Sequence, residues 1–149
     1  MKKFQFSLNT VLSYKQQRLE LLQNEHSVLL LHVQAAERRL FELQAQYGQE
    51  REEYAVKSSQ GISITEARLW ESKFRALEQD IQAAAKKLEE EKSIAEKKRE
   101  EVVDAKKDTT SIEKLKEKKI AAYQKAAEKE TEHLIDEFVS SVSASTANQ

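Results

Sequence analysis

The first part of the chain carries an apolar repeat that is typical of a coiled coil. From Leu8 to Tyr54 the repeat positions follow one another in alternating steps of four and three, and almost all of them are apolar. Such a 3.5-residue repeat places the side chains on one narrow stripe of an α-helix, which we call the seam, and a partner helix must cover it. We therefore predict one helix over about residues 7–58. Three seam positions are polar: Lys15, His26 and Glu50.

A turn signal follows this helix. Gly61 suits the left-handed conformation that ends many helices, and Ser63 with Glu66 has the spacing of a capping box that begins one. A stop followed at once by a start predicts a turn over about residues 59–64. Gly48 has no helix breaker beside it, so we expect the helix to tolerate it at a cost of about 1 kcal/mol.

The seam resumes after the turn in steps of three and four, at Ala67, Trp70, Phe74, Leu77, Ile81, Ala84 and Leu88. We predict a second helix over about residues 65–142, followed by a flexible tail at 143–149. Between Lys86 and Lys119 the apolar stripe thins amid dense mixed charge, which makes this stretch a charged spacer. The stripe reappears in a shifted register from Ile120.

Two helices joined by a short turn pack antiparallel. The predicted fold is therefore all-α, a long antiparallel two-helix coiled-coil hairpin in which the second helix is longer than the first. We expect it to form a single domain over residues 1–149. With a fold-back near Gln60–Gly61, Leu8 lies opposite Ile112–Leu115, and Tyr54 lies opposite Ala67 or Trp70.

The difference in helix length leaves Ile120–Val142 without a partner in the same chain. This stretch contains Tyr123, Leu134, Ile135 and Phe138, which would face water unless another molecule covers them. The stretch is therefore a candidate binding surface.

Composition favours long helices and narrows the chemistry. The chain has no proline, two glycines and 34% charged residues, and the absence of proline permits uninterrupted helices. Its net charge of -1 gives no overall preference for nucleic acid. No apolar run approaches the roughly 20 residues of a membrane span, so we expect a soluble protein.

The residues offer little for catalysis. There is no cysteine, and the three histidines lack metal-ligand spacing, so we predict no enzyme activity, no cofactor and no metal. His26 is interpreted, like Lys15 and Glu50, as a polar residue that fixes the register of the coiled coil. The lysines at 114–119 are interpreted as a solvated helix face, with an acidic partner surface as the alternative.

Several aromatic residues gather near the predicted turn: Tyr47, Tyr54, Trp70 and Phe74. Seam packing accounts for most of this clustering. A two-helix hairpin cannot bury a large indole completely, so part of Trp70 should remain available to a partner.

Motifs along nearly the whole chain carry a family resemblance: Phe4-x-Phe6-x-Leu8-x-x-Val11-Leu12-x-x-Lys15, the turn Gly61-Ile62-Ser63, Trp70 with Leu77-x-x-x-Ile81, Lys114-Leu115-Lys116-Glu117-Lys118, Tyr123 and Ile135-Asp136-Glu137. With this layout the chain resembles the flagellar export protein FliJ. The resemblance implies a cytoplasmic, stalk-like component of the flagellar type III export apparatus. Such a protein inserts into the ring of the export ATPase and promotes its assembly and activity.

The resemblance also implies contacts with the cytoplasmic domain of the export gate and with export chaperones. The chain would be a monomer or weak homodimer, peripheral at the gate and not membrane-spanning. By analogy with rotary-ATPase stalks, the helix ends would lie in the ATPase ring, which implies roles there for Phe4, Phe6, Leu8, Leu12, Tyr123, Leu134, Ile135 and Phe138. The hairpin tip would face the gate, which implies roles there for Tyr47, Tyr54, Trp70 and Phe74.

Two other hypotheses stay open at this point. In the first, the chain is a structural scaffold that dimerises as a parallel rod through a helix continuous across Gly61. In the second, it is the stalk of a virulence secretion system or of a V-type ATPase.

Overall fold

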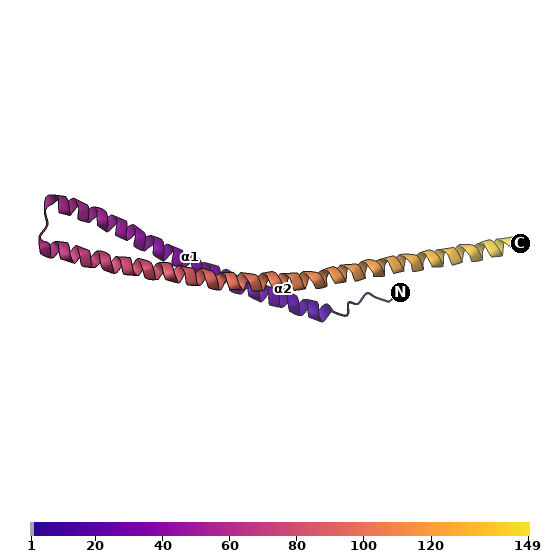
Figure 1. The fold of residues 1–149 in the computed structure, drawn as a ribbon. Coiled ribbons are helices and arrows are strands. Elements are labelled where there is room, and N and C mark those ends of the chain that lie inside the picture. The colour runs from indigo at the N-terminus through magenta and orange to yellow at the C-terminus, as the bar shows by residue number, and fades with distance from the viewer. Residues whose placement is uncertain (1) are drawn as a thin grey trace. The chain divides into compact units, whose positions relative to one another are not determined.

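The computed structural model describes residues 2–149, and its secondary structure consists of two helices, α1 (Asn9–Gln60) and α2 (Ile64–Ala147) (Figure 1). The helices contain 52 and 84 residues. The predicted fold class, an antiparallel two-helix hairpin with the longer helix second, is confirmed. Met1, where the predicted domain begins, lies outside the described residues.

The structure divides into two compact units, which we describe separately. The turn unit comprises Glu20–Val103, and the terminal unit comprises the chain up to Leu19 together with Asp104–Gln149. Each unit contains a stretch of α1 packed against a stretch of α2. That the whole chain forms one domain stays a prediction.

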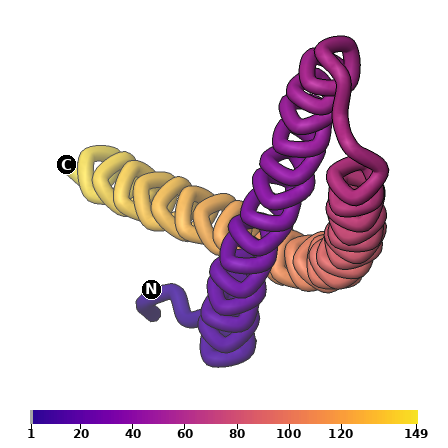
Figure 2. The backbone as a smooth tube through the Cα atoms, turned by 90° about the vertical axis from the view of Figure 1, so that its left-hand side faces the viewer, coloured from indigo at the N-terminus to yellow at the C-terminus, as the bar shows by residue number. Residues whose placement is uncertain are grey.

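In the turn unit the chain reverses over residues 61–63, between the ends of α1 and α2 (Figure 2). Gly61 has a φ of +95°, and its amide bonds to the carbonyl oxygen of Ser58 at 3.3 Å, which ends α1 as predicted. The Ser63 hydroxyl accepts a hydrogen bond from the Glu66 amide at 3.1 Å and so caps the start of α2. The hypothesis of a helix continuous across Gly61 is therefore wrong.

The predicted seam forms the core of the turn unit. Its most buried side chains are Leu22, Ala36, Leu43, Phe74, Leu77, Leu88 and Ala95. The ring of Tyr54 lies 5.7 Å from that of Trp70, which is the pairing that the sequence predicts. Gly48 sits within α1 with open space around it, consistent with a tolerated helical glycine.

The charged middle of α2 is not a spacer. Glu91, Lys98 and Val102 are half-buried around the buried Ala95, and their steps of three and four continue the seam. The prediction failed because it counted apolar residues only. Charged side chains occupy seam positions here because an ion pair satisfies them: the Lys98 ammonium lies 3.0 Å from the Glu25 carboxylate on α1.

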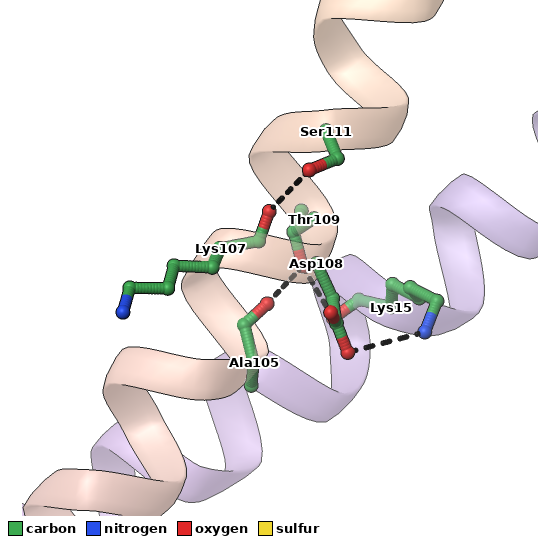
Figure 3. Close-up of polar contacts among 6 residues, drawn as sticks. All are labelled: Lys15, Ala105, Lys107, Asp108, Thr109 and Ser111. Carbon is green, nitrogen blue, oxygen red and sulfur yellow. Dashed lines mark hydrogen bonds and ion pairs between the residues drawn. The ribbon is translucent and has the colours of Figure 1, made fainter.

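In the terminal unit α1 and α2 are joined by a polar layer (Figure 3). Thr109 is only 2% exposed, and its hydroxyl lies 2.8 Å from the carbonyl oxygen of Ala105 and 3.4 Å from that of Lys15. The Lys15 ammonium lies 3.6 Å from the Asp108 carboxylate. Counting outward from that pair along both helices places Leu8 at the level of Leu115, in agreement with the predicted alignment.

The C-terminal end of α2 differs from the prediction. The helix continues to Ala147 where we expected a flexible tail from residue 143. Serine and threonine hydroxyls in this stretch bond back to carbonyl oxygens one turn earlier, including Ser145 to Val142 at 3.0 Å and Thr146 to Val142 at 3.1 Å. Neither proline nor glycine interrupts the backbone, so these polar residues remain compatible with a helix.

Candidate partner-binding surfaces

The N-terminal segment, residues 2–8, precedes α1 and packs on α2 within the terminal unit. The Phe4 and Tyr123 rings lie 5.5 Å apart, and the Tyr123 hydroxyl donates a hydrogen bond to the carbonyl oxygen of Lys2 at 2.6 Å. Ile120 is half-buried, as are both rings. The prediction that the whole of Ile120–Val142 lacks a partner in the chain is therefore wrong for its first part.

The reason for this extra coverage is geometric. A helix advances about 1.5 Å per residue, whereas extended backbone advances about 3.3 Å. The few residues before α1 thus cover about twice their own number on α2, which a helix-against-helix count does not include. The seam of α2 records the change of partner, because two successive steps of four, Ile112 to Lys116 to Ile120, occur where α1 begins. This is the predicted shift of register.

Beyond Ala127 every residue of α2 is exposed, and one side of the helix there is apolar. We call this side the C-terminal face; it consists of Leu134, Ile135, Phe138, Val139 and Val142, whose spacing confines them to an arc of about 140°. Leu134 is 61% exposed and Phe138 69% exposed. Large apolar side chains gathered on one helix face and left open to water mark an interaction surface.

Charge is segregated around this face. Residues 128–149 contain five acidic residues and one lysine, a net charge of -4 with His133 neutral. The remainder of the terminal unit, residues 2–19 and 104–127, contains eleven basic and four acidic residues, a net charge of +7, and we call it the basic collar. The overall charge of -1 conceals this separation.

The other residues predicted for the ATPase end also lie in the terminal unit but differ in exposure. Leu12 is buried against α2, whereas Phe6 is half-buried and Leu8 is exposed. Phe6 and Phe4 border a hollow of about 350 Å³ that Lys116 also lines. Leu12 therefore packs the hairpin, whereas Leu8 lies at the surface and Phe4 and Phe6 are partly accessible.

The four aromatic residues predicted for the gate contact form one cluster in the turn unit, which we call the tip cluster. Phe74 is buried at its centre, with ring centroids 5.7 Å from Tyr47, 5.6 Å from Tyr54 and 5.7 Å from Trp70. The structure thus brings together residues from both sides of the turn, as predicted. Phe74 is enclosed by its neighbours, so Trp70 offers more surface to a partner than Phe74 does.

Cations cover much of the tip cluster. The Lys57 and Lys73 ammonium groups lie 5.3 and 5.1 Å from the centroid of the Trp70 ring, within cation-π range. The Tyr47 hydroxyl donates a 2.9 Å hydrogen bond to Glu78, and this bond raises the pKa of Tyr47. These contacts hold the aromatic rings in place at the surface.

Glu50 is the polar seam position beside this cluster. One carboxylate oxygen lies 3.1 Å from the Lys73 ammonium. The other is buried, and the described residues provide it with no hydrogen-bond partner. The ion pair supports the predicted role of Glu50 in fixing register, as the pair with Asp108 does for Lys15.

Two exposed apolar residues near the turn were not among the predicted site residues. Ile64 and Leu69 lie off the seam and are both largely exposed. Leu69 and Trp70 line a hollow of about 150 Å³ together with Glu66 and Lys73. Such residues can be identified in the sequence as large apolar residues that fall outside the seam positions, where polar residues are usual.

Across residues 2–149, no group of histidine and acidic side chains is arranged to hold a metal ion. No helix in the same range is long and apolar enough to cross a membrane.

Neither a curated protein nor a solved structure matches the chain. A family model does match: that of FliJ, described as flagellar FliJ protein, over residues 4–147. The matched range covers both helices and the N-terminal segment almost completely. Together with the hairpin and its longer second helix, this match shows that the chain belongs to the FliJ family, a family of non-catalytic proteins of flagellar export.

Proposed function

We propose that this protein is a non-enzymatic, cytoplasmic component of the flagellar type III export apparatus that binds the export ATPase ring as a stalk-like regulator. The observation that supports the proposal most directly is the C-terminal face, where exposed apolar side chains recur on successive turns near the C-terminal end of α2. Membership of the FliJ family supplies the flagellar setting. No residue of the chain takes part in ATP chemistry in this proposal; the protein acts by contact.

The terminal unit provides the contact. Leu134, Ile135 and Phe138 present apolar surface on a helix that their own chain leaves uncovered, and a ring-shaped partner would bury them from several sides. Phe4, Phe6, Leu8 and Tyr123 extend the same contact toward the start of α1. Leu12 supports it from beneath, because it is buried against α2.

The test uses the purified export ATPase of the same organism. We expect the wild-type chain to raise its ATP hydrolysis and to promote ring assembly, and Leu134→Ser with Phe138→Ser to abolish most of both effects. The matched control is Leu31→Ser with Phe41→Ser on α1 of the turn unit, because those residues have the same types and are 62% and 71% exposed. Circular dichroism checks that both double variants keep their helices.

Two results would overturn the proposal. In the first, the wild-type chain leaves ATP hydrolysis and ring assembly by the export ATPase unchanged. In the second, the control double variant loses as much of both effects as the double variant on the C-terminal face. The second result would mean that apolar surface in general, and not this face, drives the effect.

We further propose that the tip cluster contacts the cytoplasmic domain of the export gate, and that the chain also binds export chaperones. Tyr47, Tyr54 and Trp70 are its half-buried members, and the buried Phe74 contacts all three rings. Trp70 is the single tryptophan of the chain, so its fluorescence reports on this surface alone. Titration with the gate domain should shift the emission; an unchanged spectrum at saturating gate domain would contradict the assignment.

A further inference from the structure

We propose that the terminal unit binds an anionic phospholipid bilayer along a row of lysines on α2. The row, which we call the lysine stripe, consists of five exposed residues: Lys107, Lys114, Lys118, Lys125 and Lys129. Four of them belong to the basic collar, and the fifth follows it directly. The proposed function does not use this surface, so the inference does not depend on that function.

The spacing of these lysines places them on one side of α2. They follow one another at intervals of 7, 4, 7 and 4 residues. At about 100° and about 1.5 Å per residue, they occupy an arc of about 60° and a length of about 33 Å. Thr109 contacts α1 and Tyr123 contacts the N-terminal segment, and both lie about 160–200° around the helix from Lys107. The stripe therefore faces away from the parts of the terminal unit that pack on α2.

The first turns of the stripe can be followed in Figure 3. The Lys107 side chain points away from Lys15, whereas the next residue, Asp108, pairs with Lys15. Ser111 lies on the stripe side as well, and its hydroxyl donates a 2.9 Å hydrogen bond to the Lys107 carbonyl oxygen. The polar layer and the stripe thus occupy different sides of the same stretch of helix.

The chain does not neutralise the charge of the stripe. Within the described residues, none of the five ammonium groups takes part in an ion pair. No acidic residue between Lys107 and Lys129 falls on the same arc; the nearest, Glu128, lies about 40° outside it. The stripe is thus a straight band of uncompensated positive charge.

The composition of this side of α2 favours a membrane over other anionic partners. The residues between the lysines are small, Ser111, Ala121 and Ala122, with no arginine, aromatic or large apolar side chain among them. Protein interfaces are depleted in lysine and depend on aromatic and arginine anchors, and single-stranded nucleic acids stack on aromatic rings. An anionic bilayer requires none of these, because it attracts each ammonium group through charge alone.

The end of α2 limits the contact. Glu132 and Asp136 continue the arc of the stripe beyond Lys129, and an anionic surface repels them. Leu134 and Phe138 lie on the opposite side of the helix from the stripe. The C-terminal face therefore stays open to a protein partner while the stripe is bound to lipid.

The expected affinity follows from the number of lysines. Each lysine close to an anionic membrane strengthens binding about fivefold, so five give half-maximal binding at roughly 0.3 mM accessible lipid. No large apolar group lies on this side to enter the hydrocarbon, so the binding is peripheral and reversible.

Cosedimentation of the full chain with lipid vesicles tests the proposal. We expect the chain to bind phosphatidylcholine vesicles that contain about 30% phosphatidylglycerol at about 0.15 M salt, and to be released at about 0.5 M salt. Vesicles of phosphatidylcholine alone should leave it in solution. Lys114→Gln with Lys118→Gln should weaken binding about 25-fold, from about fivefold for each lysine.

The matched control is Lys106→Gln with Lys119→Gln. It removes the same charge from exposed positions on the same stretch of α2, about 110° off the centre of the stripe. These side chains lie about one screening length farther from the bilayer, so their loss should weaken binding only about threefold. Lysine and glutamine have similar helix propensities, and circular dichroism checks that both double variants keep their helices.

A fluorescent label gives a readout of orientation. The chain lacks cysteine, so Ser111→Cys and Ser13→Cys each provide a single labelling site. Ser111 lies on the stripe side of α2, whereas Ser13 is exposed on α1, which packs on the other side of α2. Nitroxide groups on the lipid headgroups should quench the label at position 111 more strongly than the label at position 13.

Several results would overturn the proposal: no binding to the anionic vesicles, equal binding to neutral ones, equal weakening by the two double variants, or equal quenching of the two labels. Tighter binding to a DNA duplex of about 20 base pairs than to the vesicles at the same salt would also overturn it, because the stripe would then be a nucleic-acid surface.

Discussion

Removing the Phe74 side chain should destabilise the hairpin far more than removing an exposed phenylalanine. Phe74 is 7% exposed and contacts three aromatic rings, whereas Phe41 on α1 is 71% exposed. Phe74→Ala and Phe41→Ala therefore delete the same atoms from two different environments within the turn unit.

The expected magnitude follows from burial. A buried phenylalanine replaced by alanine typically costs about 3–5 kcal/mol, and aromatic pairs add about 0.5–1.5 kcal/mol each. A two-helix core lets water reach part of the vacated space, and alanine has a helix propensity better by about 0.5 kcal/mol, so we expect a net loss of about 3 kcal/mol. For Phe41→Ala the same propensity offsets the small lost contact, and the free energy of unfolding should change by less than about 0.5 kcal/mol.

Urea denaturation followed by far-ultraviolet circular dichroism measures both variants. With a slope of about 2 kcal/mol per molar urea, Phe74→Ala should lower the unfolding midpoint by about 1.5 M. Trp70 fluorescence follows the same unit independently, because its ring lies 5.7 Å from Phe74. Equal losses for the two variants would refute the reasoning, since burial in the tip cluster would then contribute nothing.

Three further perturbations test other parts of the structure. Gly61→Ala should lower the free energy of unfolding by about 1–2 kcal/mol, because φ at Gly61 is +95°. Gly48→Ala should raise it by up to about 1 kcal/mol, because Gly48 is helical and has open space around it. Thermal denaturation distinguishes the two variants. The pKa of Tyr47 is raised by its hydrogen bond to Glu78, so the stability from this bond is complete below pH about 10 and is lost as pH rises through the higher folded value. Tyr47→Phe should remove that loss from alkaline denaturation curves. Tyr123→Ala removes the ring and hydroxyl that hold the N-terminal segment, so it should speed amide hydrogen exchange in residues 2–8 and leave exchange in the turn unit unchanged. Equal protection of residues 2–8 in the wild-type and variant chains would show that Tyr123 does not hold the segment.

The seam was predictable because its period is long and regular. Each of its positions from Leu12 to Tyr54 is buried or half-buried, including the polar Lys15, His26 and Glu50. The turn was predictable for a similar reason, since the left-handed glycine and the serine cap are local signals. Both predictions depend on residues whose structural preference is set by the local sequence and not by the side chains that they contact.

The N-terminal segment was not predictable in the same way. Phe4 and Phe6 carry no helical period, so the sequence does not say that they fold back along α2 toward Tyr123. The candidate surface was consequently placed too early, at Ile120, although its exposed part at Leu134–Val142 was identified. A short extended segment leaves no repeat in the sequence, and only the structure shows what it covers.

The prediction of a charged spacer in α2 was wrong because charged side chains there pair across the two helices and do not only face solvent. In the structure, ion pairs link Lys15 to Asp108, Glu25 to Lys98 and Glu50 to Lys73. The two members of each pair are equally distant along the chain from the peptide bond between Gly61 and Ile62. Opposite charges at equal distances from one bond specify the register of an antiparallel pair of helices.

The same charges reject the neighbouring register. A fold-back centred on Gln60–Gly61 would set Lys15 opposite Lys106, Glu25 opposite Glu96 and Glu50 opposite Glu71, which are three like-charge pairs in place of three attractions. Apolar seam residues resemble one another and so distinguish neighbouring registers less sharply, whereas each of these three charge pairs changes from attraction to repulsion. The polar positions that weaken the apolar repeat are therefore the ones that select a single alignment of α1 and α2.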